Sequence, residues 1–170
     1  MRRATGIIHV FTFKTGLLAA AAHDLRLRFD GFTCHLQDQT VTVVIPLNAL
    51  RVDGPVRGGV VRTEEYDPAR RAEIEAAARR EVLRADHFPT ATFKGQALPV
   101  AAGYDVRGTL NLAGQDAPLA FSVTRHGPQY RAVFELKPSR WGIAPYSAAL
   151  GTIRVQDRVR IELALTAIPD

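Results

Sequence analysis

The alternation that decides the fold is clearest over residues 104–112, which read YDVRGTLNL. Tyr104, Val106 and Leu110 fall on one side of an extended chain, and Asp105 and Arg107 fall on the other. This period of two is typical of a β-strand with one packed face and one face in water. The segment therefore predicts one strand of an antiparallel sheet.

The same pattern recurs on both sides of this segment. Seven further strands are predicted, at residues 7–14, 24–36, 40–47, 90–98, 117–125, 130–137 and 156–167. A helix is predicted over residues 68–84, because Asp67 can cap its first turn and Pro68 suits the first helical position. Residues 48–67 are rich in glycine and are predicted to form a long loop, and residues 138–153 to be irregular.

Eight antiparallel strands with one helix predict a closed barrel, because tilted strands that close on themselves remove both exposed sheet edges. The chain has 170 residues and shows no internal repeat or linker. A chain of this length can bury a core without metals or disulfides. We therefore expect a single domain over residues 1–170, all-β with one flanking helix.

Composition excludes several classes of protein. Apolar residues make up 46% of the chain and charged residues 23%, which is typical of a globular domain. The formal charge is +5, but the arginines are scattered, and those of residues 70–80 lie among glutamates. This spacing favours a solvated helix face over a nucleic-acid site. We therefore predict no nucleic-acid partner. No apolar run reaches the length of a membrane span, so no membrane span is predicted either.

The single cysteine, Cys34, cannot form an internal disulfide, and a half-buried strand position is favoured over a nucleophile paired with His35. Residues 1–22 resemble a signal peptide loosely, but His9 and Lys14 interrupt the apolar run. We interpret the segment as part of the fold. The expected location is the cytoplasm, with the periplasm as the alternative.

No motif in the sequence predicts catalysis. Gly58-Gly59 lacks the Lys and Ser/Thr of a phosphate-binding loop, and no Gly-x-Ser-x-Gly elbow is present. The five histidines are far apart and have no metal-ligand spacing. The sequence therefore predicts no catalytic residue, no metal site and no cofactor.

The inward apolar side chains are the candidate ligand-binding residues. They are Phe11, Phe13, Leu27, Phe29, Phe93, Val106, Leu110, Phe121 and Phe134, with Ala132 as a small neighbour that leaves room for a ligand. His23, Arg140 and Trp141 are candidates for the rim. Two interpretations stay open for the rim: a polar mouth that fixes a ligand's head group, or the favoured structural one, in which His23 caps a short helix and Trp141 plugs the barrel end.

Four blocks resemble the YceI-like family and occur in that family's order. They are His23-Asp24, residues 84–93 (RADHFPTATF), residues 104–114 (YDVRGTLNLAG), and residues 140–146 (RWGIAPY) leading to Gly151 and residues 155–157 (VQD). The resemblance implies a lipocalin-like barrel whose interior, in some members, takes up polyisoprenoid chains such as isoprenoid quinones. The chain departs from the family in its early first strand, in a shorter link between helix and Phe88-Pro89, and in Trp141, where many members carry phenylalanine.

The leading hypothesis is that the barrel binds a long apolar ligand, a polyisoprenoid, isoprenoid quinone or similar lipid, as a carrier or store. One alternative is a solid-core structural or protein-interaction module, with a homodimer left open. A second alternative is an enzyme that acts on an apolar substrate. Hollow and filled barrels need the same inward apolar residues, so the pattern does not separate them.

Overall fold

The structure is a computed structural model and describes residues 2–15, 24–148 and 153–168. The strands are β1 (Arg2–Thr15), β2 (Asp24–Phe29), β3 (Thr33–Gln37), β4 (Thr40–Pro46), β5 (Arg51–Arg57), β6 (Val60–Val61), β7 (Thr90–Val100), β8 (Gly103–Leu112), β9 (Gln115–His126), β10 (Gln129–Leu136), β11 (Ser147–Ala148) and β12 (Ile153–Ile168). The helix α1 (Pro68–Ala77) continues into a π-helical turn at Ala78–Val82, and two 3₁₀ turns lie at Leu47–Ala49 and Pro138–Trp141.

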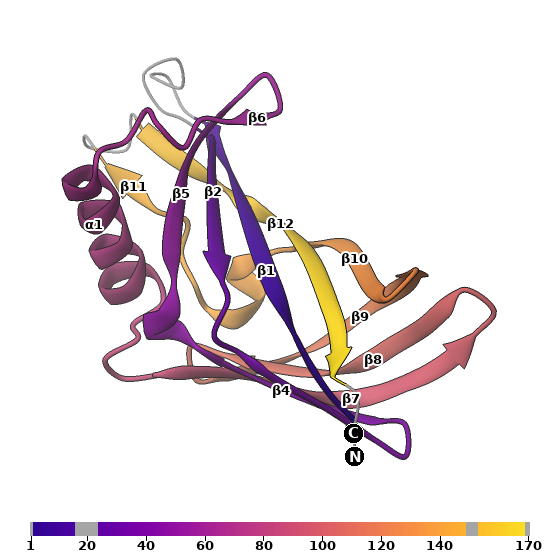
Figure 1. Cartoon of the computed structure of the whole chain (residues 1–170). Coiled ribbons are helices and arrows are strands. Elements are labelled where there is room, and N and C mark those ends of the chain that lie inside the picture. Colours follow the sequence, from indigo (N-terminus) through magenta and orange to yellow (C-terminus); the bar gives the residue numbers. More distant parts are fainter. Residues whose placement is uncertain (1, 16–23, 149–152, 169–170) are drawn as a thin grey trace.

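Eight of these strands close into an antiparallel barrel with α1 on one side (Figure 1). Their order is β1-β3-β4-β7-β8-β9-β10-β12, and β12 pairs back onto β1. The two terminal strands pair from Arg3 with Ile168 to Thr15 with Arg154. The predicted eight-stranded barrel with one flanking helix is confirmed. No helix in the described ranges is long and apolar enough to cross a membrane.

The predicted strand 24–36 is two strands, because the chain leaves the sheet between Phe29 and Thr33. β1 pairs with both of them, with β3 at residues 2–4 and with β2 at residues 8–12. Gly31 lies in the break, and a glycine inside a strand pattern often marks a kink or bulge.

The prediction of a loop over residues 48–67 is wrong for residues 51–57 and 60–61, because β5 pairs with β2 and carries β6 at its outer edge. Val52 and Pro55 of β5 are buried, and the backbone N–H of Val52 donates to the Glu75 carboxylate of α1 at 2.9 Å. Gly54 is needed because a Cβ there would lie 2.5 Å from the carbonyl oxygen of Arg62. The glycine and proline that suggested a loop are thus residues of a strand next to the edge of the sheet.

The start of the helix follows its predicted signals, and its end differs. The Asp67 carboxylate accepts a hydrogen bond from the backbone N–H of Arg70 at 2.7 Å, with Pro68 in the first turn. Beyond Ala77 the chain forms a π-helical turn instead of continuing to residue 84 as an α-helix. Such turns are common at functional sites.

A buried carboxylate joins three strands on the outer face of the sheet. Asp53 of β5 is 4% exposed and lies at a shift of register between β2 and β5. It accepts hydrogen bonds from Arg26 at 2.6 Å and from Arg28, and His9 of β1 lies 3.8 Å away. Burial, and then the charge of Arg26, lower the pKa of His9 below its ordinary value of 6.5.

Glycines on the inner face let β7 and β8 approach closely. Gly95 and Gly108 are direct partners across the two strands. A Cβ at Gly108 would lie 2.2 Å from the carbonyl oxygen of Lys94 and 2.8 Å from the ring of Phe93. Backbone at this distance leaves no room for a side chain, so this part of the barrel wall depends on glycine.

We expect Gly108→Ala to lower the free energy of unfolding by about 1–3 kcal/mol or more, because the added methyl group meets backbone that cannot move aside. Urea unfolding measures the loss. Gly31→Ala is the control, since its Cβ would lie 3.8 Å from the nearest atom, and we expect a change within about 0.5 kcal/mol. Equal stability of the two variants would contradict the close approach.

We expect the His9→Gln variant to lose less stability than the parent as the pH falls. The folded pKa of His9 lies below 6.5, so the unfolded chain binds a proton more readily. The stability that neutral His9 contributes is therefore fully present above pH 6.5 and is lost as the pH falls below it. Urea unfolding of parent and variant across that range should show the parent losing more stability, whereas parallel pH curves would contradict the burial of a neutral His9.

Candidate functional site

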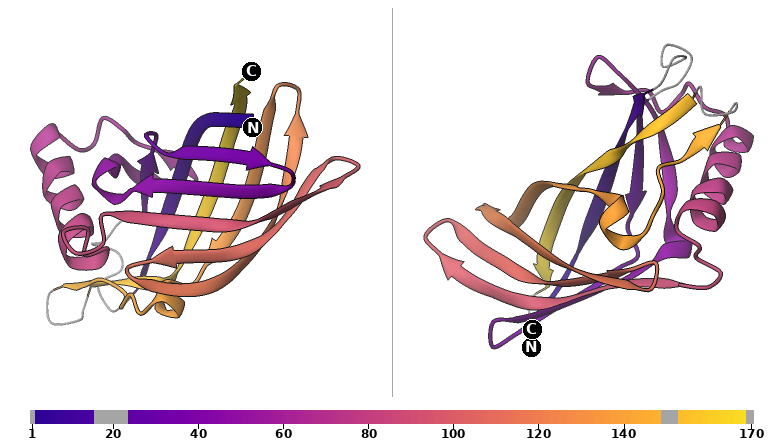
Figure 2. Two further views of the ribbon diagram at one scale, coloured as in Figure 1. Left: turned by 90° about the horizontal axis from the view of Figure 1, so that it is seen from below. Right: turned by 180° about the vertical axis from the view of Figure 1, so that it is seen from behind.

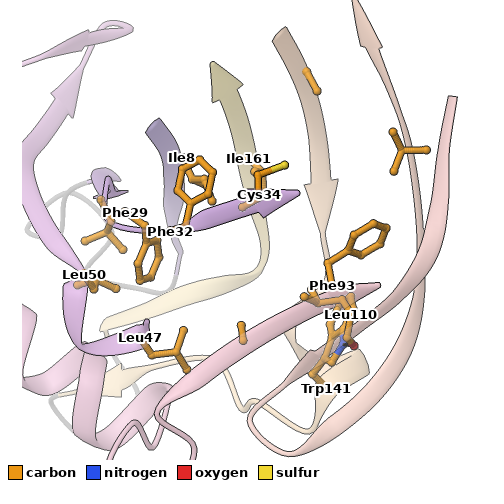
Figure 3. Close-up of a cluster of buried hydrophobic side chains, with 14 of the residues drawn as sticks. Ile8, Phe29, Phe32, Cys34, Leu47, Leu50, Phe93, Leu110, Trp141 and Ile161 are labelled. Atoms are coloured by element: carbon orange, nitrogen blue, oxygen red, sulfur yellow. Dashed lines mark hydrogen bonds between the residues drawn. The ribbon is translucent and has the colours of Figure 1, made fainter. Parts of the chain in front are cut away.

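A cavity of about 240 Å³ lies inside the barrel, toward the helix. It is lined by Ile8, Val10, Thr12, Leu27, Phe29, Val43, Ile45, Leu47, Leu50, Ala78, Val82, Leu83, Ala91, Phe93, Leu110, Leu112, Leu119, Phe121, Phe134, Leu136, Pro138, Trp141, Ile143, Val159, Ile161 and Leu163. Figure 3 shows several of these side chains, with Leu47 and Leu50 across the interior from Phe93 and Trp141. The interior is therefore hollow over this part of its length.

The walls of this larger cavity suit an apolar guest. Among the described lining residues only Thr12 carries a hydroxyl, and the indole N–H of Trp141 already donates to the Leu110 carbonyl at 2.7 Å. An apolar cavity of about 150 Å³ stays dry and takes up benzene. The larger cavity exceeds that volume and offers water few partners, so it favours an apolar ligand.

Two short turns close the helix side of the larger cavity. Ala78 and Val82 approach from the π-helical turn and Leu83 from directly after it, and Pro138 and Trp141 approach from a 3₁₀ turn. Of these residues, the sequence predicted only Trp141 as part of the site. The spacing of Ile74, Ala78 and Val82 could have predicted this contact, because an apolar stripe on a helix packs against the core of the protein.

A second cavity of about 110 Å³ lies in the part of the barrel farther from α1. It is lined by Ala4, Cys34, Leu36, Val41, Ala97, Tyr104, Val106, Val123, Tyr130 and Leu165. The rings of Tyr104 and Tyr130 lie 5.8 Å apart between centroids. Burial raises the pKa of the Cys34 thiol, which disfavours the thiolate that a nucleophile would need.

Small residues separate the two cavities. The strand alternation places Gly6, Gly95, Gly108 and Ala132 on the inward face, between the residues that line one cavity and those that line the other. On β10, for example, Tyr130 lines the second cavity, Phe134 lines the larger one, and the buried Ala132 lies between them. The two cavities therefore follow one another along the interior.

Most of the predicted pocket residues come together, although their role in binding stays a prediction. Seven line the larger cavity, namely Leu27, Phe29, Phe93, Leu110, Phe121, Phe134 and Trp141, and Val106 lines the second. Ala132 lines neither cavity. Arg140 is exposed, with its guanidinium 5.6 Å from the Trp141 ring and bonded to the Pro118 carbonyl at 3.2 Å. His23 lies outside the described residues.

Phe11 and Phe13 do not face inward, which corrects the prediction for β1. Ile8, Val10 and Thr12 line the larger cavity instead. The guanidinium groups of Arg160 and Arg158 lie 4.3 and 4.2 Å from the ring centroids of Phe11 and Phe13 on the outer face. Both faces of residues 7–13 are largely apolar, so the alternation alone could not choose between them.

The acidic and metal-ligating side chains of the described residues do not gather in the interior. Within residues 2–15, 24–148 and 153–168, no three His, Cys, Asp or Glu side chains come together as metal ligands would. The buried Asp53 lies on the outer face with Arg26 and Arg28, away from both cavities. The arrangement of the interior is that of a binding cavity.

Solved structures share this fold at low sequence identity. BcnA of Burkholderia cenocepacia matches with a TM-score of 0.63 and 14% identity, over 96% of both chains. A polyisoprenoid binding domain from Saccharophagus degradans, implicated in plant cell wall breakdown, matches with a TM-score of 0.61 and 13% identity over 98% of both chains. The Campylobacter jejuni YCEI protein matches with a TM-score of 0.52 and 14% identity over 85% of both chains.

Sequence comparison identifies the family directly. No curated protein sequence matches the chain. The model of the YceI-like domain matches residues 9–167, which include parts of both terminal strands of the barrel and everything between them. The chain therefore belongs to the YceI-like family.

Proposed function

We propose that the barrel binds a long apolar molecule of the polyisoprenoid type, as a carrier or store. The larger cavity carries this proposal, because its described walls are apolar except for Thr12. Membership of the YceI-like family supports it, and so does the likeness to the Saccharophagus degradans domain, which is described as binding polyisoprenoids.

The ligand is a chain rather than a compact molecule. The two cavities follow one another along the barrel, with Gly6, Gly95, Gly108 and Ala132 between them on four strands and the ring of Phe93 reaching over Gly108. A flexible, narrow hydrocarbon suits this shape, and its burial is worth about 25 cal/mol per Å² of apolar surface. Part of that gain offsets the loss of translational and conformational freedom on binding.

Binding accounts for the interior better than catalysis does. The polar groups among the described lining residues are the hydroxyls of Thr12, Tyr104 and Tyr130, the Cys34 thiol and the hydrogen-bonded indole of Trp141. No carboxylate or imidazole among the described residues lines either cavity. An oxygen-bearing head group would find hydrogen-bond partners at the two tyrosines, and the apolar tail would occupy the larger cavity.

We expect geranylgeraniol, a short polyisoprenoid alcohol, to bind in a 1:1 complex visible by native mass spectrometry. At a free concentration near 100 Kd it should raise Tm by about 5 °C or more, because the ligand binds the folded state alone. Glycerol and hexanol at equal concentration are the controls. An unchanged Tm, with no bound species in repeated preparations from cells, would contradict the proposal.

Val43→Phe and Val44→Phe form a matched pair on β4, because adjacent strand residues point to opposite faces. Val43 lines the larger cavity and Val44 does not. We expect Val43→Phe to weaken geranylgeraniol binding about tenfold while changing stability by less than about 1.5 kcal/mol, since the ring enters empty space. Binding to Val44→Phe should match the parent. Urea midpoints and titrations on the same preparations measure both effects, and equal binding by the two variants would place the ligand elsewhere.

A further inference from the structure

The turn between β7 and β8 exposes an apolar tip to solvent. Residues 98–102 read LPVAA, and we call them the apolar hairpin. Leu98 is 41% exposed and Val100 is 46% exposed, and Pro99, Ala101 and Ala102 are exposed as well. Single exposed apolar residues are ordinary, but a continuous group of them usually marks a surface that contacts something. Figures 1 and 2 show this turn projecting from the barrel on the side away from α1.

Positive charge accompanies the apolar hairpin. Residues 95–107 and 122–131 form two neighbouring hairpin ends and contain three arginines but one carboxylate, and the β3–β4 turn on the other side of β7 adds the exposed Asp38. Arg107, Arg125 and Arg131 are exposed, whereas Asp105 accepts a hydrogen bond from Ser122 at 2.8 Å. The backbone N–H of Arg125 donates to the Ala102 carbonyl at 2.8 Å, which ties the β9–β10 turn to the apolar hairpin.

The second cavity reaches the same end of the barrel. Of its two tyrosines, Tyr104 pairs with Pro99 of the apolar hairpin, and Tyr130 pairs with Arg125 at the end of β9. Tyrosine is enriched where protein meets the interface between membrane and water, because its ring is apolar and its hydroxyl is polar. The tyrosines face the interior, so the surface at this end consists of the apolar hairpin and the exposed arginines, with the second cavity inside the barrel at the same end.

We propose that this surface docks on an anionic lipid bilayer, with the apolar hairpin in the interface and the arginines on lipid head groups. A bilayer offers apolar matter directly beneath negative charge, and both match the surface. A second copy of the chain fits less well, because it would bring like charges together around a small apolar contact. The exchange of ligand between this bilayer and the second cavity rests on the proposed function, whereas docking itself does not.

Vesicle sedimentation with the full chain tests the proposal. We expect the parent to bind vesicles of phosphatidylcholine with phosphatidylglycerol, and to bind pure phosphatidylcholine several-fold more weakly. Leu98→Asp with Val100→Asp should lower the partition coefficient by tenfold or more. Arg107→Gln with Arg125→Gln should lower it about fivefold per charge and weaken its dependence on salt.

The control replaces exposed apolar residues elsewhere. Val60, 51% exposed in β6, and Tyr146, 38% exposed just before β11, lie outside the docking surface. Val60→Asp with Tyr146→Asp should bind vesicles as the parent does. Loss of binding in this control, equal binding by the Leu98/Val100 variant and the parent, or a parent that does not bind anionic vesicles would each overturn the proposal.

Two further measurements distinguish membrane docking from self-association and from ligand binding. Sedimentation equilibrium that finds a dimer in the parent, lost in the Leu98/Val100 variant, together with no vesicle binding, would assign the hairpin to self-association and overturn the proposal. The rise in Tm with geranylgeraniol, measured without vesicles, should persist in this variant, and it also reports that the variant is folded. A parent that binds anionic vesicles but shows no rise in Tm would refute the proposed function and leave docking intact.

Discussion

The pairing of β1 with β12 is the constraint on which the barrel depends. It joins the two ends of the chain along their length and removes the edges that an open sheet would expose. It also fixes which side chains enter the interior, because direct partners on neighbouring strands point to the same face. Phe11 lies opposite Arg160 and Val10 opposite Ile161, so the phenylalanine shares the outer face with arginine and the valine faces inward. A slip of one residue would reverse every one of these positions.

A closed ladder of backbone hydrogen bonds also explains how the interior can be hollow. The wall is held together around its circumference, so side chains do not have to fill the centre to keep the strands in place. Inward glycines such as Gly95 and Gly108 bring backbone close to backbone where a side chain would clash. These inward glycines lie between the residues that line the two cavities, and the ring of Phe93, which lines the larger cavity, reaches over Gly108.

The sequence predicted the parts of the fold in which one face of a strand is plainly apolar. The inward faces of β8, β10 and β12 follow from alternation, and the start of α1 follows from Asp67 and Pro68. Alternation failed on β1, where both faces are largely apolar, although the register of Phe11 against Arg160 would have resolved it. It also failed on β5, because Gly54 and Pro55 are residue types typical of loops although both are buried in a strand here. The cavities could not be predicted, because their volume depends on how far side chains reach across the barrel and not on their polarity. Location in the cytoplasm or the periplasm remains a prediction.

If the barrel carries a polyisoprenoid, the hydrophobic effect alone does not favour taking it from a membrane. The chain is already out of water in the bilayer, and the larger cavity offers it surroundings of similar polarity. The free energies at the two ends of the transfer are then close, which suits a carrier that must also release its ligand. The large cost lies between them, because each methylene group exposed to water costs about 0.8 kcal/mol. A surface that brings the second cavity close to the bilayer lowers this barrier without changing the free-energy difference between ligand in the bilayer and ligand in the cavity. The apolar hairpin and its arginines would therefore govern the rate of exchange, and the cavity walls would govern the affinity.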